Sequence, residues 1–260
     1  MNWHDLLDDL EDQQCVLFVG PEIIHLDQVP MNEAIRQFIM AQCPPGQILQ
    51  YYTRDGFFLF KDGTAKTNAR RYFKRFFRDH QLDDEIFRKI ISIPFPLVVS
   101  INADTILDDI AYKYGVRHRF SFYKDNSVVQ KPSAAEPLFY NLCGCKNRDD
   151  SLLLDYEDLF KLLQWALGPD GLPQKLLETL GAARTFLFLG FQFDKWHTQL
   201  LLRLLQGERT DVSNYVIQTQ VSDDETQAFL VNQFNIRFLG DQFDFFDELF
   251  QRCAERGCLR

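Results

Sequence analysis

Short apolar runs alternate along the chain with longer stretches in which apolar residues recur every three or four positions. The short runs predict strands, and the longer stretches predict amphipathic helices. The predicted strands are Cys15–Val19, Pro96–Ile101, Leu138–Leu142, Thr185–Leu189, Tyr215–Thr219 and Ile236–Leu239. The helices predicted to follow several of them are Asp104–Tyr114, Tyr156–Ala166, Lys195–Leu205, Asp223–Gln233 and Gln242–Ala254. This alternation predicts an α/β fold with a mainly parallel sheet.

Residues 29–93 lie between the first two predicted strands, and they are more chain than one crossover helix needs. The pattern predicts helices at Met31–Gln42, Lys66–His80 and Asp83–Ile91, with a short hairpin around Gly56–Phe60. We expect this segment to form a small inserted helical subdomain over the carboxyl edge of the sheet, where α/β proteins bind ligands. In that place it would act as a lid or a docking surface.

The predicted helix Lys66–His80 combines a stripe of aromatic residues with many cations. One interpretation is a helix that binds an anion or docks against another protein. The other is a helix packed on the core with a solvated basic face. The pattern alone leaves both open.

Composition and charge narrow the class of protein. A chain of 260 residues fits one large domain, with or without an inserted subdomain. The net charge of −9 argues against nucleic acid as the main partner. No apolar run reaches the roughly 18 to 20 residues that span a bilayer, and the N-terminus does not resemble a secretory signal. We therefore expect a cytoplasmic protein without a membrane partner.

The 25 phenylalanines predict a bulky interior or a buried interface, and Phe243–Phe250 fits a helix buried against a partner.

The cysteines and histidines do not predict a metal site. Six cysteines fit a reducing compartment without disulfides. Cys143 and Cys145 are the only close pair, and the five histidines have no metal-like spacing. We expect no metal.

Polar residues follow the first two predicted strands. Gly20 ends the first, but Pro21 has no N–H and Glu22 carries the charge of a phosphate, so the loop departs from a dinucleotide-binding loop. Asn102 and Asp104 follow the second strand. The amide of Asn102 has both a donor and an acceptor with which to orient a ribose or a water, and an ordinary loop role is the alternative. Asp104 is equally well placed to cap the next helix.

Two later strands end in similar segments. Cys143 and Gly144 form a turn in which the glycine allows a positive φ or a close backbone approach, and a plain turn with a buried thiol is the alternative. Gly190 ends another strand, and Asp194 is placed to cap the helix after it. His197 is alone on that helix, and we interpret it as a packing or surface residue.

In this order, the segments resemble the bacterial sirtuin-like NAD-hydrolysing domains of antiphage defence. The Gly-Ala-Gly loop of that family is matched by Gly20–Glu22, and its Thr-Thr-Asn-Tyr-Asp motif by Ser100–Asp104. Its Leu-His-Gly turn is matched by Leu142–Gly144, and the acidic segment after that turn by Leu153–Asp158. Its last motif, a strand that ends in glycine with an aspartate shortly after, is matched by Leu187–Asp194.

The resemblance spans residues 10–210. It implies a single sirtuin-like domain over residues 1–260, with a Rossmann-like sheet, helices on both faces and the inserted segment. It also implies a metal-free site for NAD in which Asn102 orients the nicotinamide ribose and water. The residues that it places at the nucleotide are Gly20, Pro21, Asp104, Gly144, Gly190, Phe191 and Asp194.

Two departures from the family pattern define a divergent variant. The family histidine, which acts as a base, is replaced by Cys143, and an unperturbed thiol is mostly protonated at neutral pH. The second glycine of the loop is replaced by Glu22, which would repel a phosphate. In a dry crevice, however, the Glu22 carboxylate could take a proton and serve as the base. Asn102, Glu22 and Cys143 are the candidate catalytic residues.

Two functions remain open at this stage. In the first, the chain is a defence effector that hydrolyses NAD⁺ to nicotinamide and ADP-ribose when triggered by a separate sensor protein or by oligomerisation. In the second, it is an inactive sirtuin-like module that binds NAD, ADP-ribose or a related nucleotide, or serves as an assembly subunit of a defence complex.

Overall fold

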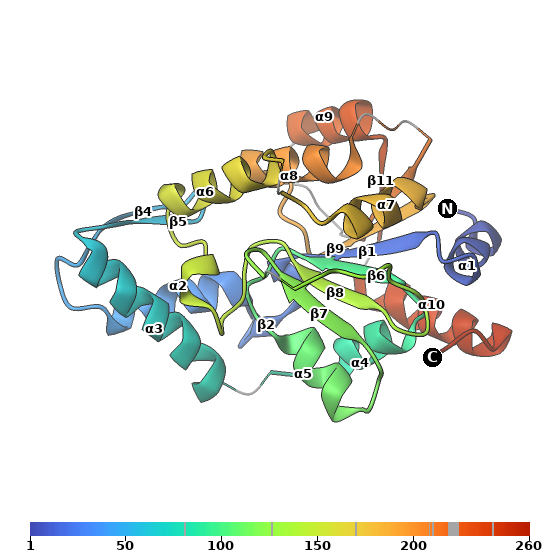
Figure 1. The fold of residues 1–260 in the computed structure, drawn as a ribbon, viewed down its shortest axis with the longest axis horizontal. Coiled ribbons are helices and arrows are strands. Elements are labelled where there is room, and N and C mark those ends of the chain that lie inside the picture. Colours follow the sequence, from blue (N-terminus) through green and yellow to red (C-terminus); the bar gives the residue numbers. More distant parts are fainter. Residues whose placement is uncertain are drawn as a thin grey trace.

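Parallel strands form the central sheet of the protein (Figure 1). The computed structural model describes residues 1–80, 82–125, 127–169, 171–207, 209, 211–217, 224–240 and 242–260, with backbone alone for residues 242 and 243. Within these residues the seven strands run in the order β11 (Ile236–Leu239), β10 (Ser213–Ile217), β9 (Thr185–Leu189), β1 (Cys15–Val19), β6 (Leu97–Ser100), β8 (Leu138–Asn141) and β7 (Arg119–Phe122). Every pairing between them is parallel. The predicted α/β fold is confirmed.

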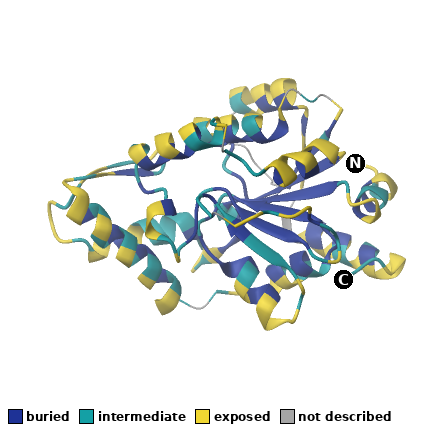
Figure 2. Cartoon of the chain, viewed as in Figure 1, coloured by how far each residue is buried: buried dark blue, intermediate teal, exposed yellow. Residues whose placement is uncertain are grey.

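Helices cover both faces of this sheet, and the central strands are buried (Figure 2). Along β1, Leu17 and Val19 pack in one apolar core, whereas Val16 and Phe18 pack in the other. A strand buried on both sides needs apolar residues at every position, which explains the unbroken run of β1. The helices of the first core are α1 (Trp3–Glu11), α4 (Glu85–Ser92), α5 (Ile106–Lys113) and α10 (Gln242–Arg256), and those of the second are α6 (Tyr156–Ala166), α7 (Gln174–Ala182), α8 (Trp196–Gln206) and α9 (Asp224–Phe234).

The inserted segment contributes α2 (Met31–Gln42), the hairpin of β4 (Ile48–Tyr52) and β5 (Phe57–Phe60), and α3 (Gly63–Asp79). These elements lie at one end of the molecule and share a small apolar core (Figure 1). Its buried residues are Ile39, Phe58, Ala69, Phe73, Leu152 and Leu154, and the last two come from the chain between β8 and α6. The third helix of the segment, α4, packs instead on α5 and α10. A role as a lid stays a prediction.

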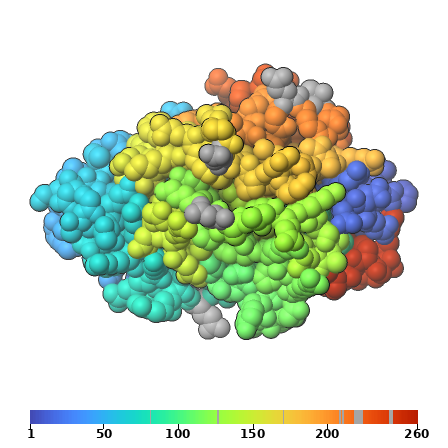
Figure 3. Space-filling model, in the orientation of Figure 1, coloured from blue at the N-terminus to red at the C-terminus, as the bar shows by residue number. Residues whose placement is uncertain are grey.

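Helix α3 is held to the rest of the chain by ion pairs. Lys66 Nζ lies 2.6 Å from Asp155 Oδ2 and 2.7 Å from Asp158 Oδ1, and Arg70 Nη2 lies 3.2 Å from the same Asp158 oxygen. Asp155 also caps α6, because its side chain accepts from the N–H of Asp158. Phe73, on the same face of α3, is also buried, so the core-packed interpretation of this helix is the one the contacts favour. Figure 3 shows its surface adjoining that of the chain around residue 150.

Helix α10 packs within its own chain. Phe246 and Leu249 are fully buried, and the ring of Phe245 stacks on that of Trp3 with centroids 5.2 Å apart. The prediction that this segment is buried against a partner is therefore wrong for these residues, while the side chain of Phe243 lies outside the described ones. In the described parts of the chain, no helix is both long and apolar enough to cross a bilayer.

Most element boundaries agree with the sequence pattern. The predicted strand at Tyr215–Thr219 begins at Ser213, and its last two residues lie outside the described ones, as does the first residue of the predicted helix Asp223–Gln233. Helices α1 and α7 and strand β7 were not predicted.

Candidate functional site

The loops after β1 and β9 meet at the point where the strand order reverses. From β1 the chain continues to β6 on one side, and it returns later to β9 on the other side. In open α/β sheets, this point forms the ligand crevice. Here the N–H of Gly20 donates to the carbonyl of Leu189 over 2.8 Å, and the N–H of Glu22 donates to that of Gly190 over 3.0 Å. The two loops are therefore joined by backbone hydrogen bonds.

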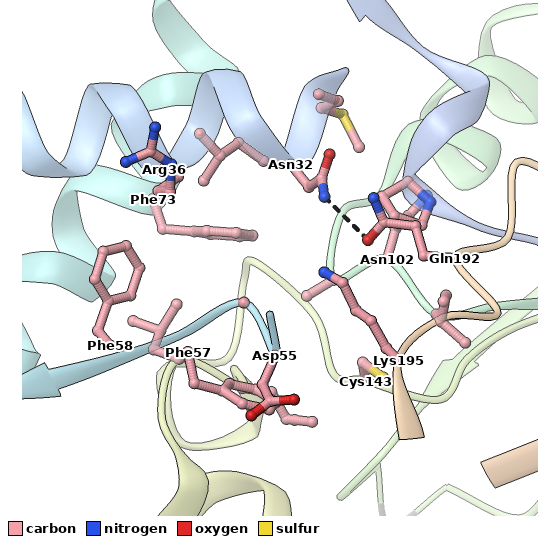
Figure 4. Close-up of a pocket in the computed structure, with 18 of the residues that line it drawn as sticks. Asn32, Arg36, Asp55, Phe57, Phe58, Phe73, Asn102, Cys143, Gln192 and Lys195 are labelled. Carbon is pink, nitrogen blue, oxygen red and sulfur yellow. Dashed lines mark hydrogen bonds between the residues drawn. The ribbon is translucent and has the colours of Figure 1, made fainter. Parts of the chain in front are cut away.

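A cavity of about 190 Å³ lies beside these loops (Figure 4). It is enclosed by residues that follow β1, β6, β8 and β9 and by residues of α2, β5 and α3. The polar and charged side chains that line it include those of Asn32, Arg36, Tyr51, Asp55, Asn102, Asp104, Gln192, Lys195, His197 and Thr198. Phe57, Phe58 and Phe73 contribute an aromatic wall. The inserted segment and the carboxyl edge of the sheet thus form the site together.

Asn102 is held rigidly at the edge of the sheet. It is 8% exposed, its N–H donates to Ser100 Oγ over 3.0 Å, and its side-chain Nδ2 donates to the carbonyl of Gly20 over 3.2 Å. One of the two side-chain N–H groups is thereby engaged. The predicted candidate lines the cavity with an amide that still has a donor and an acceptor for a ligand.

Asp104 lines the cavity and lies one residue before the N-cap of α5, which is Thr105. Its Oδ1 accepts from the N–H of Ile106 over 2.9 Å, so the carboxylate does bond a free helical N–H, although the predicted N-cap position is off by one residue. Burial raises the pKa of the Asp104 carboxyl to about 6, although the Ile106 N–H and the charge of Lys146 act in the opposite direction. The carboxyl is therefore poised to gain or lose a proton just below neutral pH.

Cys143 lines the cavity as a neutral thiol. Burial raises its pKa to about 12, so almost no thiolate is present at neutral pH, and a base or nucleophile at this position is disfavoured. Gly144 next to it has φ +98°, and a Cβ there would lie 2.0 Å from the carbonyl oxygen of Ser151. The turn needs glycine for its shape, as expected.

Glu22 belongs to a chain of side-chain hydrogen bonds. Gln192 Nε2 donates to Glu22 Oε1 over 2.9 Å, and Asn32 Nδ2 donates to Gln192 Oε1 over 3.3 Å (Figure 4). These hydrogen bonds connect the loops after β1 and β9 with α2 of the inserted segment. Glu22 itself is not among the residues that line the cavity, whereas Pro21 is.

Sequence reasoning missed Lys195 as a site residue. Its ammonium points into the cavity (Figure 4), and among the described residues no carboxylate lies within ion-pair distance of it. Burial lowers its pKa, and the nearby charges of Asp194 and Glu22 offset that effect in part. Gly56 faces it at φ +83°, and a Cβ there would lie 3.0 Å from the Lys195 nitrogen. The sequence signal that could have identified Lys195 was its position directly before a helix at the carboxyl edge of the sheet.

His197 was interpreted as a packing or surface residue, but it lines the cavity. Its ring lies 5.1 Å from that of Phe57, and its Nδ1 is buried without a hydrogen-bond partner. Burial and the charge of Lys195 lower its pKa to about 4, so the imidazole is neutral at pH 7. A neutral imidazole has a nitrogen that can accept a proton.

Five of the seven predicted nucleotide-binding residues are not among the residues that line the cavity, whereas Pro21 and Asp104 are. Phe191 is 3% exposed and packs its ring against Phe188 and Phe193 in the core. Asp194 is exposed, and α8 has Lys195 at its N-cap with no side-chain capping bond. The predicted cap at Asp194 is therefore wrong. Gly20, Gly144 and Gly190 shape the backbone around the site instead of lining it.

In the part of the chain that the structure describes, no group of three or more histidine, cysteine, aspartate or glutamate side chains could hold a metal ion.

Comparison with protein families shows that the model of the SIR2-like domain matches residues 96–239. This range begins just before β6 and ends with β11, and it includes Asn102, Asp104, Cys143 and Lys195. Comparison with curated proteins gives no match. Because the match covers more than half of the 260 residues, the chain belongs to the SIR2-like domain family.

Proposed function

We propose that this cavity binds an NAD-type nucleotide and that the chain, once triggered, hydrolyses NAD⁺ to nicotinamide and ADP-ribose. The observation that carries the proposal is the fixed amide of Asn102. It is buried, bonded to the Gly20 carbonyl, and placed in a cavity at the carboxyl edge of a SIR2-like sheet. The trigger, either a separate sensor protein or homo-oligomerisation, and the role in antiphage defence rest on the sequence resemblance.

The reaction needs little from the protein beyond position and one proton acceptor. A water oxygen bonds to C1′ of the nicotinamide ribose while the C1′–N bond breaks. The electron pair of that bond neutralises the pyridinium, and water releases one proton. Because only one N–H of the Asn102 amide is engaged by Gly20, its second N–H and its oxygen are left to orient the water or a ribose hydroxyl.

Glu22 and His197 are the candidate proton acceptors. The Glu22 carboxylate, proposed from the sequence, accepts from Gln192 and lies outside the cavity lining. The His197 imidazole lines the cavity and is neutral at pH 7, although a pKa of about 4 makes it a weak base. Burial raises the pKa of the Cys143 thiol to about 12, so it stays protonated at neutral pH and is a poorer candidate than Glu22.

NAD⁺ consumption by the purified chain tests the proposal, with and without its native partner. We expect Asn102→Ala to lower the rate by about 100-fold or more, as is typical when a group that positions the transition state is removed. Asn232→Ala, at an exposed site on α9, is the matched control and should leave the rate unchanged. Glu22→Gln and His197→Gln then identify the proton acceptor. Turnover that survives Asn102→Ala, Glu22→Gln and His197→Gln would refute this site.

A non-catalytic module is the second candidate, and the neutral thiol at Cys143 favours it. The position that carries a basic histidine in the resembling family has no base here. In that case, calorimetry would detect binding of NAD⁺ or ADP-ribose without any release of nicotinamide. Absence of both binding and turnover would leave an assembly role alone.

A further inference from the structure

We propose that the preferred ligand of the cavity is a mononucleotide, that is, a planar base on a ribose with a single phosphate, and that Lys195 binds this phosphate. The inference rests on the proposed function, because it concerns the substrate class of the same site. It is carried by three features of the cavity in the part of the chain that the structure describes: a loop whose Gly20 and Glu22 N–H groups are engaged, a lysine without an ion pair, and a small volume.

The loop after β1 offers little to a pyrophosphate. Dinucleotide-binding loops hold the pyrophosphate with free backbone N–H groups. Here the N–H groups of Gly20 and Glu22 already donate to the carbonyls of Leu189 and Gly190, and Pro21 has none. The carboxylate of Glu22 adds a like charge beside this loop, which repels phosphate. This loop therefore offers a pyrophosphate fewer donors than a glycine-rich loop does, and its charge disfavours a second phosphate.

The cavity has one cation that is ready for an anionic group. Arg36 is already engaged by Glu33, with Arg36 Nε 2.6 Å from a Glu33 carboxylate oxygen. Asp55 lies in the turn between β4 and β5 and lines the cavity. It accepts a hydrogen bond from the hydroxyl of Tyr156. In the described residues, Lys195 has no such ion pair, although its ammonium lies inside the cavity (Figure 4). A partly desolvated ammonium binds a phosphate more strongly than an exposed one does.

The rest of the cavity fits a planar ring. Phe57 and Phe58 from β5, each 5% exposed, and Phe73 from α3 form an aromatic wall on one side (Figure 4). Aromatic rings stack on planar bases and attract a pyridinium cation. Asn102 lines the same cavity and can orient the ribose between ring and phosphate.

The cavity is small and favours a small ligand. It measures about 190 Å³. Pockets for drug-sized ligands usually measure about 300 to 1,000 Å³. A mononucleotide therefore suits this cavity better than a dinucleotide, which is about twice as large. Hydrolysis of a nicotinamide mononucleotide would give nicotinamide and ribose 5-phosphate, with water supplying the new C1′–O bond and losing one proton.

The experiment compares three probes on the purified chain by calorimetry and by nicotinamide release: nicotinamide mononucleotide, NAD⁺ and nicotinamide riboside. We expect the mononucleotide to bind at least about tenfold more tightly than NAD⁺ and than the riboside, one factor of ten being about 1.4 kcal/mol. Lys195→Gln should remove the advantage over the riboside, which lacks the phosphate, and Lys195→Arg should retain most of it. Lys161→Gln is the matched control, since Lys161 is an exposed lysine of α6 paired with Glu157.

The outcomes separate the inference from the proposed function. If NAD⁺ binds as tightly as the mononucleotide or more tightly, the inference fails and the proposed function stands. If Lys195→Gln weakens mononucleotide and riboside equally, Lys195 does not bind the phosphate and the inference also fails. If none of the probes binds in any assembled state, the proposed function fails and takes the inference with it.

Discussion

Gly20 and Gly190 touch each other through their backbones where β1 and β9 end. A Cβ on Gly20 would lie 2.2 Å from the carbonyl oxygen of Gly190, and a Cβ on Gly190 would lie 2.5 Å from the nitrogen of Ile23. Real Cβ atoms do not approach other atoms so closely, so each position accepts glycine alone. The two loops therefore fill the point at which the strand order reverses. The cavity lies beside this contact and is lined by Asn102 and Lys195.

Substitution of Gly190 by alanine should destabilise the protein strongly. Gly190 has φ +65°, where a side chain costs about 1 to 2 kcal/mol, and the clash with Ile23 adds about 1 to 3 kcal/mol. We expect Gly190→Ala to lower the free energy of unfolding, measured in urea, by about 2 to 5 kcal/mol. Gly181→Ala, in helix α7 with open space around it, is the control and should be neutral or stabilising by up to about 1 kcal/mol. Equal effects at both glycines would contradict this account.

Asp158 should be a principal attachment of the inserted segment. Its side chain is 6% exposed, accepts from Lys66 and Arg70 of α3, and also accepts from the N–H of Leu154 over 3.1 Å. Asp158→Asn leaves two largely buried cations without this charge, which typically costs about 3 to 5 kcal/mol. We therefore expect a loss of about 3 kcal/mol in urea unfolding.

The neighbouring Glu157 provides the control for Asp158. It pairs with Lys161 on the exposed face of α6, where such pairs contribute at most about 1 kcal/mol. Glu157→Gln should therefore change stability little. If Asp158→Asn is as mild as Glu157→Gln, the ion pairs do not hold α3 in place.

The sequence predicted the sheet better than it predicted the site. β1 and β9 are short apolar runs buried on both faces, so their period and composition are unmistakable. β7 has only four residues, pairs on one side and begins with Arg119, so its pattern is weak. The helix α7 was missed although Leu176 and Leu180 recur at helical spacing.

The site was predicted only where it follows a strand. Asn102, Asp104 and Cys143 lie at strand ends, and the carboxyl ends of parallel strands meet at one edge. Asn32 on α2 and Gly56 next to β5 reach the same cavity from the inserted segment, and their place depends on how that segment docks. No local pattern encodes such docking, because it results from contacts distant in sequence, for example Lys66 with Asp158.

Cys143 should be dispensable for catalysis and binding. A thiol whose burial raises its pKa to about 12 supplies neither a base nor a nucleophile at neutral pH. We expect Cys143→Ala to keep nucleotide affinity and any NAD⁺ turnover within about threefold, since only a small contact is lost. Alkylation by iodoacetamide at pH 7.5, followed by mass spectrometry of the peptide, should be slower at Cys143 than in the unfolded chain. Rapid modification together with loss of turnover in Cys143→Ala would restore it as a catalytic candidate.

The stability of the protein should depend on pH through Asp104. Burial raises the pKa of this carboxyl from 3.8 to about 6 in the folded state, so the folded protein binds the proton more tightly than the unfolded chain does. The stability that the protonated Asp104 carboxyl contributes to the folded state is fully present below about pH 3.8 and is lost as the pH rises through about 6. A shift of this size corresponds to about 1 to 3 kcal/mol.

Asp104→Asn isolates this effect, because an asparagine oxygen can still accept from the N–H of Ile106 but does not titrate. The difference in urea-unfolding free energy between the wild type and the variant should shift by about 1 to 3 kcal/mol in favour of the variant between pH 4 and pH 7. His197 titrates in the opposite sense, since burial lowers its pKa to about 4, but it is present in both proteins and cancels in the difference. A difference that stays constant over this range would mean that the Asp104 carboxyl is solvated in solution, and the cavity it lines would then be open to water on that side.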